Sequence, residues 1–101
     1  RFLEHTRFFI FNNNGKNEIY ISSADWMTRN LENRVEVTCP ILDKNIKDEI
    51  NDIFNIYWSD NIKSRRLNTE IQNQYQAKPK SKKGKRSQIE IYNYYKLKLE
   101  K

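Results

Sequence analysis

Alternating apolar and polar positions predict β-structure in the first part of the chain. The run TRFFIF at residues 6–11 is rich in aromatic and β-branched side chains, and EIYIS at residues 18–22 alternates apolar and polar side chains. Between them lies NNNGKN, whose Asn-Gly pair is typical of a turn between antiparallel strands. We therefore expect a β-hairpin with a long loop, which leaves the register of its strands open.

A third alternating run, at residues 34–38, predicts another strand. Val35 and Val37 would face one way and the charged or hydroxyl side chains the other. Pro40 has no N–H group for a strand ladder, so we expect the strand to end there. The alternation is broken between residues 22 and 32, which indicates a loop with a short helical turn.

An amphipathic helix is the clearest element of the second half of the chain. Its apolar residues recur at intervals of three and four, as on one face of a helix. This apolar stripe consists of Ile46, Ile50, Ile53, Phe54, Tyr57 and Trp58. Asp43 is a suitable N-cap for the helix, and we expect the stripe to lie in the core.

A second helix is expected near the end of the chain, from Ser87 through Leu99. Ser87 and Glu90 have the Ser-x-x-Glu spacing of a capping box. The alternation of Tyr95, Leu97 and Leu99 also fits a strand, so this assignment has an alternative.

The size of the chain limits its core. A length of 101 residues allows one small domain, residues 1–101, and an apolar share of 37% makes its core marginal. We therefore expect the domain to rest on a partner surface. A single cysteine excludes an intrachain disulfide, and no apolar run has the length of a membrane span. The chain begins without an initiator methionine or a signal peptide, so we expect it to be part of a longer protein.

Positive charge is concentrated in one segment. The chain has 19 Lys and Arg against 13 Asp and Glu, and the run KPKSKKGKR at residues 78–86 contains six cations and no acid. These cations are Lys78, Lys80, Lys82, Lys83, Lys85 and Arg86. The remainder of the chain is neutral, which weighs against a uniformly basic nucleic-acid domain. A nucleic-acid-binding module based on this run remains an alternative.

Candidate chemistry lies in the neutral part of the chain. His5 and Arg7 are two positions apart, so on a strand they would share a face. An imidazole beside a guanidinium suits phosphoryl chemistry, with the imidazole as nucleophile or general acid and the guanidinium holding phosphate oxygens. The simpler alternative is a surface histidine near a chain end.

Further candidates follow in the loop and the third expected strand. The hydroxyls and amides of the loop Ser22-Ser23-Ala24-Asp25 could contact phosphate, and Arg29 and Arg34 could neutralise its charge. Glu36, two positions from Arg34, would orient that guanidinium through a salt bridge. The alternative is a turn followed by a solvated strand face.

The order of these residues resembles one half-site of the phospholipase D superfamily, which has the pattern His-x-Lys followed by Gly-Ser-x-Asn. Arg7 stands where the family has Lys, and Ser22 and Asp25 replace its Gly and Asn. These departures weigh against lipid hydrolysis. A phospholipase-D-like nuclease or lipid-modifying half-domain remains a second alternative.

Longer runs are similar to the C-terminal domain of the long, phospholipase-D-like polyphosphate kinases. The runs are RFLEHTR, EIYISSADWMTRNLENRVEV, CPILD, IYWSDNIKSRRL and IYNYY, and the resemblance covers nearly the whole chain. It implies an α+β or α/β fold. This would be a phospholipase-D-like half-domain with a mixed β-sheet packed by a long amphipathic helix and a C-terminal helix.

The resemblance also implies an activity, which is reversible transfer of the terminal phosphate of ATP to inorganic polyphosphate through a phosphohistidine. The nucleophilic histidine would lie in a preceding domain, so residues 1–101 alone are expected to be inactive. His5 matches the second histidine of the site, as general acid or phosphate ligand. Arg34 and Glu36 match charged residues of the same pocket. The weaker matches are Arg7, Ser22, Ser23, Asp25 and Arg29.

Cofactors and partners follow from the same resemblance. Mg²⁺ is expected to bind mainly outside this chain, which supplies no metal ligands, and ATP and ADP are substrates. The expected partners are polyphosphate, the other domains of the enzyme and further copies in a homo-oligomer, without nucleic acid. The enzyme is expected in the cytoplasm, either free or peripheral at the inner membrane face. The basic run would guide polyphosphate or form a plain solvated loop.

Overall fold

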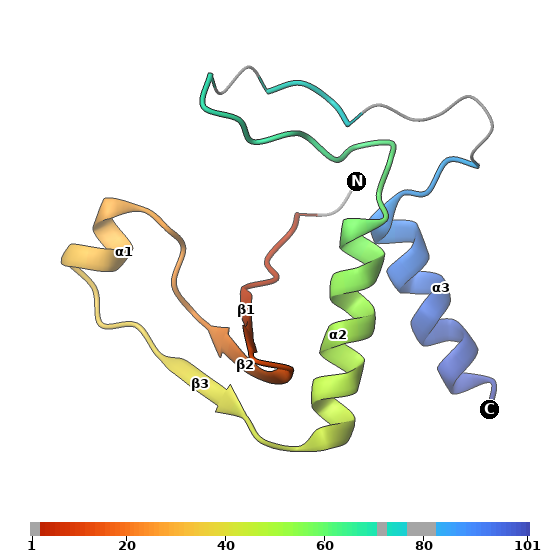
Figure 1. Ribbon diagram of the computed structural model, residues 1–101, viewed down its shortest axis with the longest axis horizontal. Coiled ribbons are helices and arrows are strands. Elements are labelled where there is room, and N and C mark those ends of the chain that lie inside the picture. Colours follow the sequence, from red (N-terminus) through yellow and green to blue (C-terminus); the bar gives the residue numbers. More distant parts are fainter. Residues whose placement is uncertain (1–2, 71–72, 77–82) are drawn as a thin grey trace. The chain divides into compact units, whose positions relative to one another are not determined.

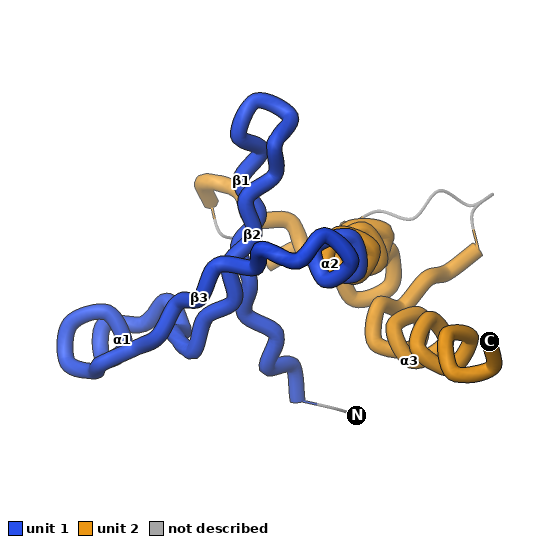
Figure 2. Tube along the Cα trace, turned by 90° about the horizontal axis from the view of Figure 1, so that it is seen from below, with its two compact units in different colours: residues 1–49 blue, residues 50–101 orange. Residues whose placement is uncertain are grey.

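The computed structural model describes residues 3–70, 73–76 and 83–101 (Figure 1). The order of elements along the chain is β1 (Phe8–Asn13), β2 (Lys16–Ser22), α1 (Thr28–Glu32), β3 (Thr38–Ile41), α2 (Lys44–Trp58) and α3 (Ser87–Leu99). The chain divides into two compact units, residues 1–49 and 50–101, with the division inside α2 (Figure 2). The strands form an antiparallel sheet and the two long helices follow it in the chain, so the α+β alternative of the expected fold class is confirmed.

The expected hairpin forms from β1 and β2. Asn13 pairs with Lys16, so the connection contains only Asn14 and Gly15. Both have positive φ, 52° and 85°, which is the conformation of a type I′ turn and favours the Asn-Gly sequence. The backbone N–H of Gly15 also donates to the side-chain oxygen of Asn12 at 3.0 Å. The prediction of a long loop with an open register was therefore wrong, since the tight turn sets the register.

The sheet has the order β1-β2-β3, and both strand pairs are antiparallel, so the sheet is not the expected mixed one. The third strand lies further along the chain than predicted. Residues 34–37 are irregular, and Val35 is 98% exposed. Pro40 lies inside β3 and pairs with Tyr20, rather than ending the strand. Proline is tolerated there because β3 is an edge strand.

Helix α2 begins as predicted. The Asp43 carboxylate accepts the backbone N–H of Ile46 at 3.0 Å, which confirms Asp43 as the N-cap. The predicted core stripe is only partly buried, because Ile53 is 9% exposed whereas Ile46 is 51% and Trp58 80% exposed. Within the described residues, Ile19 and Ile53 are the only buried apolar side chains. The core is therefore as small as the composition indicated.

Helix α3 forms as a helix rather than a strand, but the predicted capping box is not present. Its N-cap is Arg86, without a side-chain cap, and the first helical N–H, that of Ser87, donates to Asp60 at 2.8 Å. In the second unit residues 50–58 of α2 lie beside α3 (Figures 1 and 2). The Tyr94 hydroxyl of α3 donates to Asp52 of α2 at 2.9 Å. The described part of the chain contains no helix of sufficient length and apolar character to span a membrane.

Asp60 connects several backbone segments of the second unit. Its Oδ1 atom accepts the backbone N–H groups of Ile62, Lys63 and Ser64 at 2.9, 2.8 and 3.2 Å. Its Oδ2 atom accepts the N–H of Ser87. The residue is 6% exposed. Burial on its own would raise the pKa of Asp60, but the N–H donors outweigh it and lower the pKa to about 2.

The two ends of the segment between α2 and α3 are hydrogen-bonded to each other. The backbone N–H of Asn61 donates to the carbonyl of Lys85 at 3.0 Å, and the N–H of Lys85 donates to the Asn61 side chain at 2.7 Å. Together with the bond from Ser87 to Asp60, these contacts form a clasp of Asp60, Asn61, Lys85 and Ser87. The clasp holds the two ends of the segment together.

Candidate functional site

The N-terminal segment is attached to the loop after β2 by an ion pair. Arg7 donates through Nε to Asp25 Oδ1 at 2.5 Å and through Nη2 to Asp25 Oδ2 at 3.2 Å. Both side chains are partly exposed. His5 and Arg7 precede β1 rather than lying on a strand, so their expected placement was wrong. The two-pronged contact with Asp25 holds the guanidinium in place instead.

Positive charge surrounds Asp25. The hydrogen bond from Arg7 is the main reason why the pKa of Asp25 lies below its ordinary value, and it outweighs partial burial. The charges of Arg7, Arg29 and His5 lower this pKa further. Arg7, Arg29 and His5, all predicted as site residues, therefore lie within electrostatic reach of one carboxylate. The side chain of His5 is exposed, and among the described residues no hydrogen bond to its imidazole is found.

Ser22 holds the loop between strands. Its backbone N–H donates to the carbonyl of Arg7 at 3.0 Å, and its hydroxyl shares a hydrogen bond with the Thr38 hydroxyl at 3.1 Å. The same hydroxyl accepts the N–H of Ala24 at 3.1 Å. Ser22 thus joins the segment before β1 to β3 and shapes the turn that presents Asp25.

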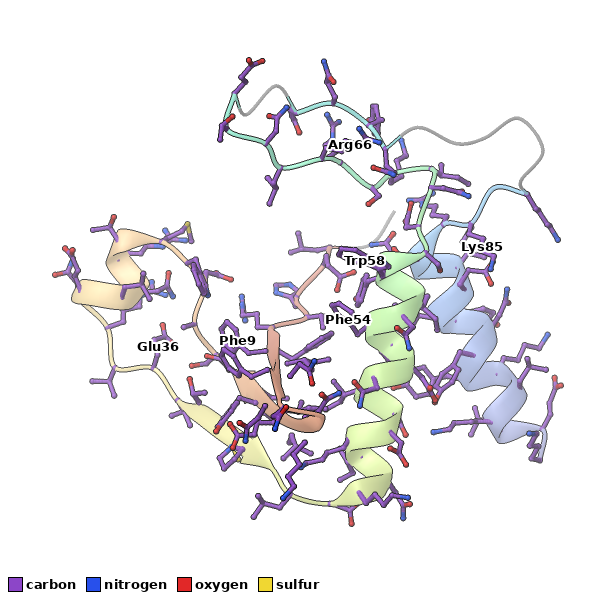
Figure 3. All side chains as sticks on the ribbon, viewed as in Figure 1. Phe9, Glu36, Phe54, Trp58, Arg66 and Lys85 are labelled. Carbon is purple, nitrogen blue, oxygen red and sulfur yellow. The ribbon has the colours of Figure 1, made fainter. Side chains whose placement is uncertain are left out.

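Glu36 lies on the irregular stretch between α1 and β3 (Figure 3). One of its carboxylate oxygens accepts the Ser23 hydroxyl, and the other accepts the side-chain amide of Asn30 at 2.8 Å. These two bonds lower the pKa of Glu36, Ser23 contributing most, and the charges of Arg34 and Arg7 lower it further. The expected salt bridge between Arg34 and Glu36 does not form. The Glu36 carboxylate instead bonds Ser23 and Asn30, and Arg34 acts on it only by its charge.

The structure brings most of the predicted site residues together in the first unit. Arg7 connects them, because its charge acts on both Asp25 and Glu36. Asn30 also belongs to this cluster, although it was not among the predicted site residues. It is 5% exposed and bonds Glu36 directly. The only signal in the sequence was its place next to Arg29, and no spacing rule connects it with Glu36.

The carboxylates of this site do not suit a divalent metal ion. Within the described residues there is no group of three or more His, Cys, Asp and Glu side chains that could hold one. Asp25 is paired with Arg7, and both oxygens of Glu36 accept hydrogen bonds. These carboxylates are therefore engaged with side chains of the protein and do not form a Mg²⁺ ligand set.

The basic run is only partly described. Lys78, Lys80 and Lys82 lie outside the described residues. Lys83 and Lys85 are exposed and belong to the second unit, as does Arg86, which donates to the Gln88 side chain at 3.4 Å. These three cations therefore belong to a different unit from the cluster around Arg7, which lies in the first unit.

The first unit has an α+β fold and carries a cluster of charged side chains, in which the Arg7 guanidinium is held by the Asp25 carboxylate and the exposed imidazole of His5 lies within electrostatic reach. The chain belongs to the polyphosphate kinase family, since residues 1–88 match the family described as polyphosphate kinase C-terminal domain 2. The polyphosphate kinases of Klebsiella pneumoniae and Escherichia coli strain K12 are 47% and 45% identical to it over 95% of the chain.

A solved structure agrees with this assignment. The crystal structure of polyphosphate kinase from Porphyromonas gingivalis matches 98% of the chain with a TM-score of 0.87 and 47% identity. The chain covers 15% of that structure and 14% of the two curated relatives. It therefore spans about one seventh of their length and corresponds to a C-terminal part of such proteins.

Proposed function

We propose that this chain is the C-terminal part of an enzyme that reversibly transfers the terminal phosphate of ATP to inorganic polyphosphate. The observation that carries the proposal is the continuous similarity to polyphosphate kinases over 95% of the chain. The similarity favours this function over a nuclease, a lipid-modifying domain or a nucleic-acid-binding module. The rest of the enzyme would supply the nucleophilic histidine, in a preceding phospholipase-D-like half-site, and most of the contacts to Mg²⁺ and nucleotide.

The cluster around Arg7 has the chemistry that phosphoryl transfer needs. A phosphoryl group in transfer spreads negative charge over its oxygens, and fixed cations stabilise that charge. Arg7, Arg29 and Arg34 are the cations, and Asp25 and Glu36 keep positive charge gathered at this place. The bidentate contact of Arg7 with Asp25 supports this role, because it holds the guanidinium in one orientation.

His5 is the general acid or phosphate ligand of the proposed reaction. When the nucleophilic histidine forms its bond to phosphorus, the bond from phosphorus to the leaving oxygen breaks, and His5 donates a proton to that oxygen. In the reverse step His5 takes the proton back. The exposed imidazole and the neighbouring positive charge suit a group that meets an anionic substrate.

The cations of the basic run, among them the exposed Lys83 and Lys85, would guide long polyphosphate by their charge and without recognition of bases.

Replacing His5 in the full-length enzyme tests the proposal. With ADP and polyphosphate as substrates, ATP formation by His5→Ala should fall by roughly three decades, because a positioned acid is lost. A loss below tenfold would show that His5 is not a catalytic residue. A wild-type enzyme that formed no ATP from polyphosphate would overturn the proposed function. Residues 1–101 alone should show no turnover, because the nucleophile is absent.

A further inference from the structure

The carboxylate of Glu36 is bonded at both oxygens by side chains from elsewhere in the first unit. The Ser23 hydroxyl donates to one oxygen and the Asn30 amide to the other, at 2.8 Å for the latter. Glu36 itself lies in an irregular stretch, where no helix or strand ladder orients its side chain. The two bonds from Ser23 and Asn30 are therefore what selects one orientation of the carboxylate.

Ser23 is itself held by the backbone next to Glu36. Its N–H donates to the Val37 carbonyl at 3.0 Å, and the N–H of Val37 donates to its hydroxyl oxygen, also at 3.0 Å. A hydroxyl has one proton to donate. The ionised carboxylate of Glu36 is a stronger acceptor than the Val37 carbonyl, which lies 3.5 Å from the hydroxyl. The proton of Ser23 is thus committed to Glu36 and is not available for a phosphate oxygen.

Asn30 occupies an unusual position for an amide. It is 5% exposed, and its side-chain oxygen has no hydrogen-bond partner among the described residues. Burying an unpaired amide oxygen is unfavourable, so stability alone does not account for asparagine here. The amide nitrogen faces the carboxylate, because only the nitrogen can donate to it. The bond to Glu36 is the evident use of this side chain.

Glu36 is held within the cluster around Arg7. Arg7 is already bound by Asp25, whereas Arg34 lies two residues from Glu36 on the same irregular stretch, and its charge acts on the Glu36 carboxylate. We infer that Ser23 and Asn30 are positioning residues, which fix the Glu36 carboxylate so that its charge is held in one place beside Arg34 for the transferring phosphoryl group. This rests on the proposed function, and it gives Ser23 a role different from the direct phosphate contact that the sequence suggested.

A double-mutant cycle in the full-length enzyme tests the inference, with ATP formation from ADP and polyphosphate as the assay. In the wild-type background, Ser23→Ala and Asn30→Ala should each lower kcat by roughly tenfold and change KM by less than about threefold. In a Glu36→Ala background the same two changes should have almost no further effect, because a positioning residue acts only through the residue it positions. Ser23→Thr, which keeps the hydroxyl, should restore most of the activity.

The matched control is Ser22→Ala, which removes the neighbouring hydroxyl. That hydroxyl bonds Thr38 and Ala24 and not Glu36, so its effect should be the same in both backgrounds. Full additivity of Ser23→Ala with Glu36→Ala would overturn the inference and show that Ser23 acts by itself. Unchanged activity of Glu36→Ala would overturn it as well. An inactive wild-type enzyme would instead refute the proposed function, and this is known before any variant is compared.

Discussion

Removing the Asp60 carboxylate is expected to destabilise the start of α3 and the loop after α2 by about 2–3 kcal/mol. The side chain is 6% exposed and accepts four backbone N–H groups, those of Ile62, Lys63, Ser64 and Ser87. In Asp60→Ala these four donors lose their partner in a place where water has limited access. Unpaired N–H groups at a helix start are among the costlier losses that a single substitution causes.

The lowered pKa of Asp60 expresses the effect of the same hydrogen bonds as a dependence on pH. Its value of about 2 in the folded protein lies well below the ordinary 3.8. A separation of this size corresponds to about 2.5 kcal/mol of preference of the folded state for the ionised group. Because the folded pKa is the lower one, this stabilisation is complete above pH 3.8 and is lost as the pH falls toward 2.

Hydrogen–deuterium exchange in the full-length protein measures the effect at the relevant amides. In Asp60→Ala the protection of residues 62–64 and of Ser87 should fall by roughly 50-fold. Asp43→Ala is the matched control, because Asp43 is an exposed cap that accepts one N–H, from Ile46. Its removal should cost about 1 kcal/mol at the start of α2. Equal losses at the two sites, or a loss below about 0.5 kcal/mol at Asp60, would refute the reasoning.

Two further substitutions test the hairpin and the site. Gly15→Ala should destabilise the β1–β2 hairpin by about 1 kcal/mol, because φ is +85° at Gly15. Hydrogen–deuterium exchange of the β1 and β2 amides measures this loss, and unchanged protection would contradict the turn geometry. Arg34→Ala should lower kcat/KM for polyphosphate by roughly a hundredfold through lost charge stabilisation. Arg66→Ala removes the same charge in the second unit and should change kcat/KM less than threefold, and similar losses in both variants would show a merely general charge effect.

Local patterns predicted the elements well where one segment determines its own structure. The stripe after Asp43 specified α2 because helix periodicity and an N-cap are both local, and the Asn-Gly pair specified a hairpin for the same reason. The third strand was misplaced, because the alternation of Val35 and Val37 indicates a strand but does not provide a partner. Pairing with β2 begins only at Thr38.

The candidate site was predicted in its composition but not in its connections. Arg7 and Asp25 were both recognised, yet their mutual ion pair depends on how the hairpin and the following loop fold back. The spacing predicted a salt bridge between Glu36 and Arg34, whereas in the structure the Glu36 carboxylate accepts hydrogen bonds from Ser23 and Asn30. Asn30 was missed because its bond to Glu36 joins α1 to an irregular stretch six residues on, where no helix or strand periodicity predicts which side chains meet. The capping of α3 by Asp60 was missed because these residues are 27 positions apart and their contact carries no local signature.

The clasp of Asp60, Asn61, Lys85 and Ser87 makes the segment between α2 and α3 a replaceable module. Its two ends are joined by the clasp itself, and the backbone bonds from Arg66 to the Gln74 carbonyl and from Gln76 to the Ser64 carbonyl pair described residues within it. For a loop in general, each doubling of length costs only about 0.6 kcal/mol of closure entropy. We therefore expect that basic residues can be added, lost or exchanged on the C-terminal side of this pairing while the helix pair is preserved. Chimeras that retain the clasp should keep wild-type amide protection at Ser87, which allows substrate guidance to be varied separately from the fold.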